Sequence, residues 1–493
     1  MKKIVIIGGG IAGLTSGIYA QKYGFESVIY EKHSFVGGQC TGWDRKGYHI
    51  DGCIQWLTGT KEGNDLNDLW MEVGALGIVE IIQLDNFGTY EYEGTSITLW
   101  KDLDRLQKEM TKLSPEDAGA INEFILDIKA VQSMEMPARV PVGMMKFPEM
   151  IKYVFSMRGM VKVMGRLGKV SFTDYAEHFK HPVLKSMFTL SAPGNYSVIA
   201  LIFGMGTFSG GNGAIPMGGS KQMALRMEER YRKLGGKVNC NVSAEEIVIE
   251  GKRAVAVRFS DGTTVKADYV IAACDVKVTF DRLLKGRYND KKFEMRYHNP
   301  VDYSLPSSVQ AAFGVSEDLH DYPRSLSFPT EPFQVGVSEQ KALGMANYCY
   351  QPDFAPQGCT VVVSTVNQTD PDYFYWEELY RDKEAYRKEK QRIAEEILKR
   401  LEKRFPELSG KITVLDVATP MTYHRYTGAY HGAWMSFMMT TKSKYMEHSG
   451  KIKGLENCFL TGQWLMPPGG LPVAAITGKF TILKIAKKEK CLK

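Results

Sequence analysis

The chain has 493 residues, which is too long for one simple core and predicts two or three domains. Hydrophobic residues make up 44% and charged residues 24%, without a low-complexity run, so disordered and fibrous classes are excluded. The net charge of +6 is too small and too dispersed to predict a nucleic-acid partner, although it could favour an anionic membrane surface.

The first residues predict a dinucleotide site. An apolar run at residues 4–7 is followed by Gly8, Gly10 and Gly13 in a Gly-x-Gly-x-x-Gly pattern and then by a helix-like stretch, residues 14–23. A strand, a glycine turn and a helix N-terminus in this order form a diphosphate cradle, because the helix dipole and its free N–H groups attract anions.

A second strand, residues 27–30, ends in Glu31, eighteen residues after Gly13. An acid at this offset is placed to accept a hydrogen bond from a ribose hydroxyl. Lys32 follows, and a Gly-Gly pair ends at Gly38. This stretch resembles the Glu-then-Gly-Gly extension of flavoproteins with two dinucleotide-binding domains, and the resemblance implies FAD rather than NAD.

Turn residues between short β-rich runs at residues 39–53 predict a hairpin that returns to the cofactor. The phytoene desaturase, carotenoid isomerase and retinol saturase family, a relative of the flavin amine oxidases, carries a Gly-x-x-aromatic/apolar-Asp-x-Gly segment at this place. The sequence resembles that family in keeping Asp51 and departs from it in lacking a proline near Cys53.

The eight cysteines are scattered, without a Cys-x-x-Cys pair or metal-ligand spacing, which favours reduced thiols in a cytoplasmic protein and predicts no metal site. Cys40 lies in a segment similar to that of disulfide reductases, but their second cysteine follows within a few residues and here the next is Cys53. A redox disulfide is therefore not expected. No signal peptide or membrane-spanning window is recognised either.

Residues 64–133 mix helical periodicity with strand-like stretches at residues 87–92 and 96–100 and lead into a second domain. Pro115, directly after Ser114, predicts a helix start.

Residues 134–170 combine eight methionines with seven cations, and Glu149 is the one acid after Glu135. Two interpretations stay open. The stretch could lie in a membrane interface or line an adaptable lipid-binding tunnel. It could equally be an amphipathic helix on an ordinary core, with its cations in solvent.

Residues 215–275 resemble the family's Pro-x-Gly-Gly helix and the strands after it. The resemblance implies that residues 237–247 form a strand returning to the nucleotide domain and that the backbone of Ala244 contacts adenine. Asp261 and Gly262 predict a hairpin turn. Residues 290–410 leave that domain again, with strands at residues 307–315 and 360–366 and one long amphipathic helix at residues 376–405.

Aromatic residues crowd the stretch 423–434, where they could form a wall for a flat apolar substrate or simply a packed loop. No spacing identifies a general acid or base. Asp51, His424, Tyr430 and His431 are the candidates, because the resemblance brings their segments near the flavin.

The chain closes with a strand and a Gly-rich turn before a helix, at residues 454–475, which suits negative charge on a reduced flavin. This resembles the family's closing signature. Gln463 stands where amine-oxidase relatives place an acid. The residues predicted to bind FAD are Gly8, Gly10, Ile11, Ala12, Gly13, Glu31, Lys32, Gly38, Gln39, Ala244, Gly462, Gln463, Leu471, Pro472 and Val473.

The predicted fold is α/β. A Rossmann-like FAD-binding domain (residues 1–100, 215–290 and 412–493) is interleaved with an α+β substrate domain. The substrate domain has a helical part, residues 101–214, that is a candidate for membrane contact, and a strand and helix part, residues 291–411.

The predicted function is an FAD-dependent oxidoreductase that desaturates or saturates a carbon–carbon bond of an apolar isoprenoid, carotenoid or retinoid-like substrate by hydride transfer at flavin N5. NAD(P)H is a candidate electron partner, although no second dinucleotide fingerprint is present. The alternatives are an amine oxidase, a redox-neutral polyene isomerase and a non-enzymatic lipid-binding escort protein. Peripheral membrane contact through residues 134–170 is a hypothesis, and substrate, direction and oligomeric state stay open.

Overall fold

A five-stranded parallel sheet forms one side of the molecule in the computed structural model, which describes residues 1–492. Its strands, in spatial order, are β10 (Lys237–Asn239), β2 (Glu26–Tyr30), β1 (Lys3–Ile7), β14 (Tyr269–Ala272) and β20 (Cys458–Leu460). The central strands β1 and β14 are almost wholly buried, as expected of a parallel sheet that is covered on both faces.

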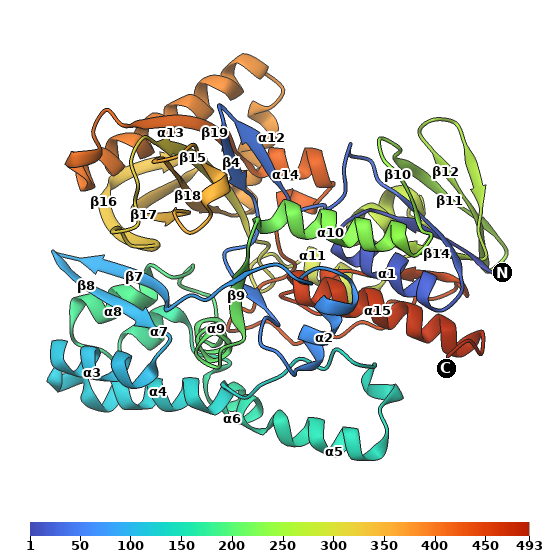
Figure 1. Ribbon diagram of the computed structural model, residues 1–493, viewed down its shortest axis with the longest axis horizontal. Coiled ribbons are helices and arrows are strands. Elements are labelled where there is room, and N and C mark those ends of the chain that lie inside the picture. The colour runs from blue at the N-terminus through green and yellow to red at the C-terminus, as the bar shows by residue number, and fades with distance from the viewer. Residues whose placement is uncertain (493) are drawn as a thin grey trace.

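Three helices pack beside this sheet (Figure 1). They are α1 (Ile11–Lys22), α10 (Gly219–Lys233) and α15 (Leu471–Lys488). Helices α1 and α15 approach so closely that a Cβ at Gly478 would lie 2.6 Å from the carbonyl oxygen of Ala12. This contact fixes the N-terminus of α1 at the end of β1, where the cradle was predicted.

A smaller antiparallel sheet follows α10 along the chain. It contains β11 (Ala244–Glu250), β12 (Arg253–Phe259) and β13 (Thr264–Lys266). The hairpin predicted at Asp261 and Gly262 is confirmed, with Gly262 at φ +83°. Residues 237–247, expected as one strand, divide into β10 and β11, because the chain turns at Asn241, whose φ is +60°.

A seven-stranded mixed sheet forms a second lobe, at the upper left of Figure 1. In spatial order its strands are β19 (Ile412–Ala418), β15 (Ser307–Val315), β18 (Thr360–Gln368), β17 (Ser338–Asn347), β16 (Ser325–Val335), β7 (Asn86–Tyr92) and β8 (Thr95–Trp100). Residues 86–100, which were expected in the first part of the FAD-binding domain, thus lie in this sheet.

Two helices pack against the second sheet, where the sequence predicted one. The chain forms α12 (Asp370–Leu379) and then α13 (Lys383–Arg404). The break lies at Asp382, whose side chain accepts hydrogen bonds from the N–H groups of Glu384 and Ala385 and so starts a new helix.

The third layer is helical and occupies the lower part of Figure 1. Its helices are α3 (Leu103–Leu113), α4 (Ala118–Val131), α5 (Phe147–Ser156), α6 (Arg158–Leu167), α7 (Phe172–Ala176), α8 (Pro182–Thr189) and α9 (Ile199–Ser209). Pro115 starts a 3₁₀ turn that leads into α4, so the predicted helix begins three residues later as an α-helix. Within residues 1–492 no helix combines the length and apolarity needed to cross a membrane.

Short elements join the three layers. They are β3 (Gly42–Arg45), β4 (Tyr48–Asp51), β5 (Leu57–Thr58), α2 (Asp65–Glu72), β6 (Ile81–Ile82), β9 (Gly213–Pro216), α11 (Lys291–Tyr297) and α14 (Pro420–Thr427). The hairpin predicted at residues 39–53 is confirmed as β3 and β4.

Candidate functional site

A cavity of about 1770 Å³ lies where the three layers meet. One end is lined by the glycine turn after β1, the middle by the segment around Trp434, and the other end by methionines of α6 and the adjoining loop. Its walls therefore come from the parallel sheet, the seven-stranded sheet and the helical layer together.

The glycine turn leaves open space at the start of α1. A Cβ at Gly13 would lie 2.0 Å from the carbonyl oxygen of Gly8, so the turn and the helix touch through their backbones. A Cβ at Gly10 would meet nothing nearer than Gly37 O at 3.8 Å and would extend the wall of the cavity. Helix α1 has no side-chain cap, so its first N–H groups are left for an anionic ligand.

Glu31 lies at the end of β2, beside this turn. Its two carboxylate oxygens accept hydrogen bonds from Gly9 N at 2.7 Å and from His33 N at 2.8 Å, which fix the side chain at the cavity wall. Lys32 donates to the carbonyl oxygen of Arg425 at 2.9 Å, and burial lowers the pKa of this lysine. Ala244, at the start of β11, lines the same end of the cavity.

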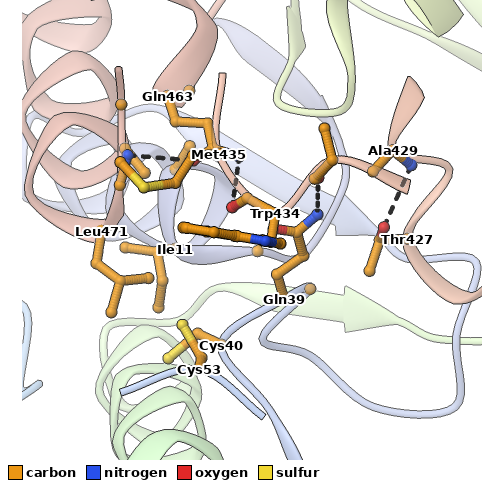
Figure 2. Close-up of a pocket in the computed structure, with 18 of the residues that line it drawn as sticks. Ile11, Gln39, Cys40, Cys53, Thr427, Ala429, Trp434, Met435, Gln463 and Leu471 are labelled. Atoms are coloured by element: carbon orange, nitrogen blue, oxygen red, sulfur yellow. Dashed lines mark hydrogen bonds between the residues drawn. The ribbon is translucent and has the colours of Figure 1, made fainter. Parts of the chain in front are cut away.

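The C-terminal segment forms the next part of the wall. Gln463 accepts a hydrogen bond from Gly470 N at 3.1 Å and so holds the turn that precedes α15. Helix α15 begins at Leu471, again without a side-chain cap. Figure 2 shows Gln39 and Gln463 on either side of Trp434, whose indole lies across the cavity. The Trp434 N–H is buried without a hydrogen-bond partner, so this region has a free donor for a polar ring.

The residues predicted to bind FAD converge on the cavity with one exception. Gly13 packs behind the turn against Gly8 and does not line the cavity. The residues that line it are Gly8, Gly10, Ile11, Ala12, Glu31, Lys32, Gly38, Gln39, Ala244, Gly462, Gln463, Leu471, Pro472 and Val473.

The four candidates for a catalytic acid or base are placed differently. His424, Tyr430 and His431 lie outside the cavity lining. The imidazole of His424 bonds to Ala429 O at 3.0 Å, and that of His431 bonds to Asp370 at 3.0 Å, so both rings have structural partners. Tyr430 stacks on His431, with 3.8 Å between ring centroids.

Asp51 does line the cavity, but its carboxylate is already engaged. It is 1% exposed and accepts hydrogen bonds from Cys53 N, Ile54 N, Ser220 N and the Ser220 hydroxyl. Burial raises its pKa, and these hydrogen bonds oppose that shift. The carboxylate joins the β3–β4 hairpin to the N-terminus of α10 and has the environment of a structural group.

Sequence reasoning missed Asp275, which follows β14 and also lines the cavity. It accepts hydrogen bonds from Lys277 N at 2.7 Å and from Tyr430 N at 3.0 Å. Burial raises its pKa to about 6. The signal available in the sequence was its position directly after a buried strand, where ligand-facing residues of parallel sheets gather.

We expect Asp275 to make the free energy of unfolding depend on pH. A carboxyl whose folded pKa is about 6 and whose ordinary value is 3.8 stabilises the fold below about pH 4 and loses that contribution as the pH rises towards about 6. The shift corresponds to about 3 kcal/mol. The Asp275→Asn variant should flatten the profile over this range, as measured by urea unfolding at a series of pH values. A profile unchanged by the substitution would contradict the assignment.

The far end of the cavity is largely apolar, although Glu135 and Glu447 also line the cavity. The large apolar side chains that line it are those of Met134, Met136, Met157, Met160, Met164, Phe203, Met438 and Met439. The sequence singled out the methionines of residues 134–170 but not Phe203, Met438 and Met439, which come from distant segments. Of the aromatic residues in the stretch 423–434, Tyr423, Tyr426 and Trp434 line the cavity.

A parallel sheet with a glycine cradle, an acid after its second strand and a second uncapped helix beside the same cavity form a dinucleotide site that fits FAD. Comparison with known families agrees. The chain belongs to the family of flavin containing amine oxidoreductases, whose model matches residues 11–481.

Individual relatives cover nearly the whole chain at low identity. The lycopene-forming phytoene desaturase of a Paracoccus species is 24% identical, over 97% of this chain and 96% of its own. The chloroplastic prolycopene isomerase of Daucus carota is 21% identical, over 98% of this chain and 79% of its own. A solved oxidoreductase from Methanosarcina mazei shares the fold, with a TM-score of 0.61 at 17% identity, over 98% of this chain and 100% of that one.

Proposed function

We propose that this enzyme acts on carbon–carbon bonds of an apolar polyene or isoprenoid substrate. The observation that carries the proposal is the continuity of the cavity, which runs from the cradle at Gly10 to an apolar end lined by methionines such as Met160 and Met164. Carotenoid-converting relatives support this substrate class. Unbranched, polarizable methionine side chains adapt to a long flexible ligand.

Different residues of the chain would hold the different parts of FAD. The N-terminus of α1 and Gly10 would receive the diphosphate, Glu31 the ribose, and the backbone of Ala244 the adenine. Gln463 and the N-terminus of α15 would hold the flavin ring, whose negative charge on reduction the helix dipole stabilises. When bound, FAD supplies hydride transfer at N5.

The apolar end would bind and orient the substrate and exclude water. Met157, Met160 and Phe203 offer no hydrogen-bond donor that would favour a polar ligand. Water excluded from such a site cannot compete for a reactive intermediate. This wall would therefore exclude water and orient the substrate carbon against the flavin.

The first test of the function is spectroscopic and uses purified protein reconstituted with FAD. Anaerobic NADPH that bleaches the flavin bands would support a saturating reductase. Turnover of a polyene only with an added electron acceptor would support a desaturase, and turnover without net electron transfer would support an isomerase. Oxidation of a simple amine, with no conversion of any polyene, would contradict the proposal.

Helices α5 and α6 would bring this end of the cavity to a membrane. Helix α5 has no buried residue, and Phe147 is 78% exposed, Phe155 56% and Val161 62%. Cations alternate with these side chains along the two helices. Tyr153 and Met157 of the same region line the cavity, so an apolar substrate could pass from lipid into it.

We expect a Phe147→Glu/Phe155→Glu variant to lose liposome binding. Each phenylalanine that leaves an apolar environment costs about 1.5–3 kcal/mol, so partition onto anionic vesicles should fall at least about tenfold in a flotation assay. An Ile78→Glu/Val337→Glu variant, in which two other exposed apolar residues are replaced, is the control. Equal flotation of both variants and the parent protein would contradict membrane contact through α5.

A further inference from the structure

Two cysteines that are distant in the sequence lie opposite each other beside the cavity. In the β3–β4 hairpin Gly42 pairs with Asp51, and Gly52 N donates to Thr41 O at 2.9 Å. Cys40 and Cys53 lie just beyond this last cross-strand hydrogen bond, one on each side of the hairpin. The hairpin thus brings Cys40 and Cys53 together although their separation in the sequence argued against a redox pair.

The two thiols are free and in contact. Figure 2 shows their sulfur atoms side by side. A hydrogen bond with Cys53, together with burial, raises the pKa of the Cys40 thiol well above its usual value.

The pair faces the part of the cavity assigned above to the flavin. Cys40 and Cys53 line the cavity together with Ile11 and Leu471, the first residues of α1 and α15 (Figure 2). Cys40 is 1% exposed, so reagents reach it only through the cavity or through Cys53. The Cys40 thiol also donates a hydrogen bond to Ser220 O at 3.4 Å. Cys274 lines the same cavity, and its thiol lies 3.3 Å from the hydroxyl of Thr279.

We propose that Cys40 and Cys53 form a dithiol–disulfide redox centre that exchanges an electron pair with the flavin. The inference rests on the proposed binding of FAD in this cavity. The two thiols give two electrons and two protons to oxidised FAD, and one S–S bond forms between them. A small external dithiol then reduces that bond by exchange, with first attack at the more exposed Cys53, and leaves as its own disulfide. The site therefore takes small dithiols as electron donors.

The test follows thiols and flavin separately in the FAD-loaded protein. Diamide oxidation, acid quench, alkylation and peptide mass spectrometry should find one bond between Cys40 and Cys53 in the parent protein. The bond should also form in Cys274→Ser, the control from the same cavity, and be absent in Cys53→Ser. Anaerobic reduced dithiothreitol should bleach the flavin at least about tenfold more slowly in Cys53→Ser than in the parent protein or the control.

Two results would overturn the proposal. One is the absence of a bond between Cys40 and Cys53 in protein that carries its flavin. The other is a bond that forms while the flavin bleaches equally fast in Cys53→Ser. Circular dichroism and flavin content of Cys40→Ala and Cys53→Ala show whether either cysteine is needed for folding. Polyene turnover is measured separately, so a failure of the proposed substrate class leaves the thiol result intact and distinguishable.

Discussion

The Gly10→Ala variant is expected to fold as the parent protein does and to bind FAD more weakly. The added methyl group meets no protein atom nearer than 3.8 Å, but it enters the cradle at the start of α1. Overpacking of this kind costs about 1–3 kcal/mol, which corresponds to a roughly five- to 150-fold higher Kd. Flavin fluorescence titration of the apoprotein measures the Kd, and thermal unfolding without FAD measures the fold.

Two other glycine variants serve as controls. Gly119→Ala, in α4, adds the same methyl group where no atom lies within 4 Å, so it should leave the Kd unchanged. Its thermal stability should be equal to that of the parent protein or slightly higher, because alanine favours a helix over glycine. Gly13→Ala drives a Cβ to within 2.0 Å of Gly8 O and should destabilise the apoprotein itself. Unchanged FAD affinity in Gly10→Ala would place the diphosphate elsewhere.

The Asp51→Ala variant is expected to have a lower free energy of unfolding, because the Asp51 carboxylate has a structural role rather than a catalytic one. Its carboxylate accepts from Ser220 N and the Ser220 hydroxyl at 2.6 Å each, and from Cys53 N at 2.9 Å. A negative charge at the first turn of α10 also stabilises that helix through its dipole. Leaving these buried donors without a partner should cost about 3 kcal/mol or more. Urea unfolding of the apoprotein measures the loss.

The same hairpin offers the control. Asp44→Ala removes an exposed carboxylate and should change the free energy of unfolding by less than about 1 kcal/mol. Asp51→Asn keeps the volume but replaces one acceptor oxygen by a donor, so its loss should lie between the two. An Asp51→Ala protein as stable as the parent but unable to turn over would instead support Asp51 as a catalytic base.

The cradle could be predicted from sequence because its determinants are local. The strand, the turn through Gly8, Gly10 and Gly13, and the acid Glu31 all lie within one short segment, and each requirement is set by its neighbours. The hairpin at residues 39–53 was predicted for the same reason. The paired strands β16 and β17 were missed, because Pro329 and Pro332 and several charged residues make residues 325–347 resemble a loop.

What the sequence could not show was which distant side chains meet. Asp51 was a candidate base because its segment approaches the flavin, and nothing near it in the sequence reveals that Ser220 occupies its carboxylate. The prediction of a single helix at residues 376–405 was wrong because of a capping residue. Asp382 is compatible with a helix by periodicity, and only its capping geometry shows that one helix ends and another begins.

The order of strands in the parallel sheet has a consequence for synthesis on the ribosome. Strand β14 pairs with β1 on one side and must wait on the other for β20, which begins at Cys458. At about 5–20 residues per second, the stretch after Ala272 takes on the order of 10–40 s to emerge. Throughout that interval the edge of β14 lies open to wrong partners, and α15 does not yet exist. The sheet and the wall of the cavity formed by α15 can therefore be completed only after the last part of the chain has been synthesised.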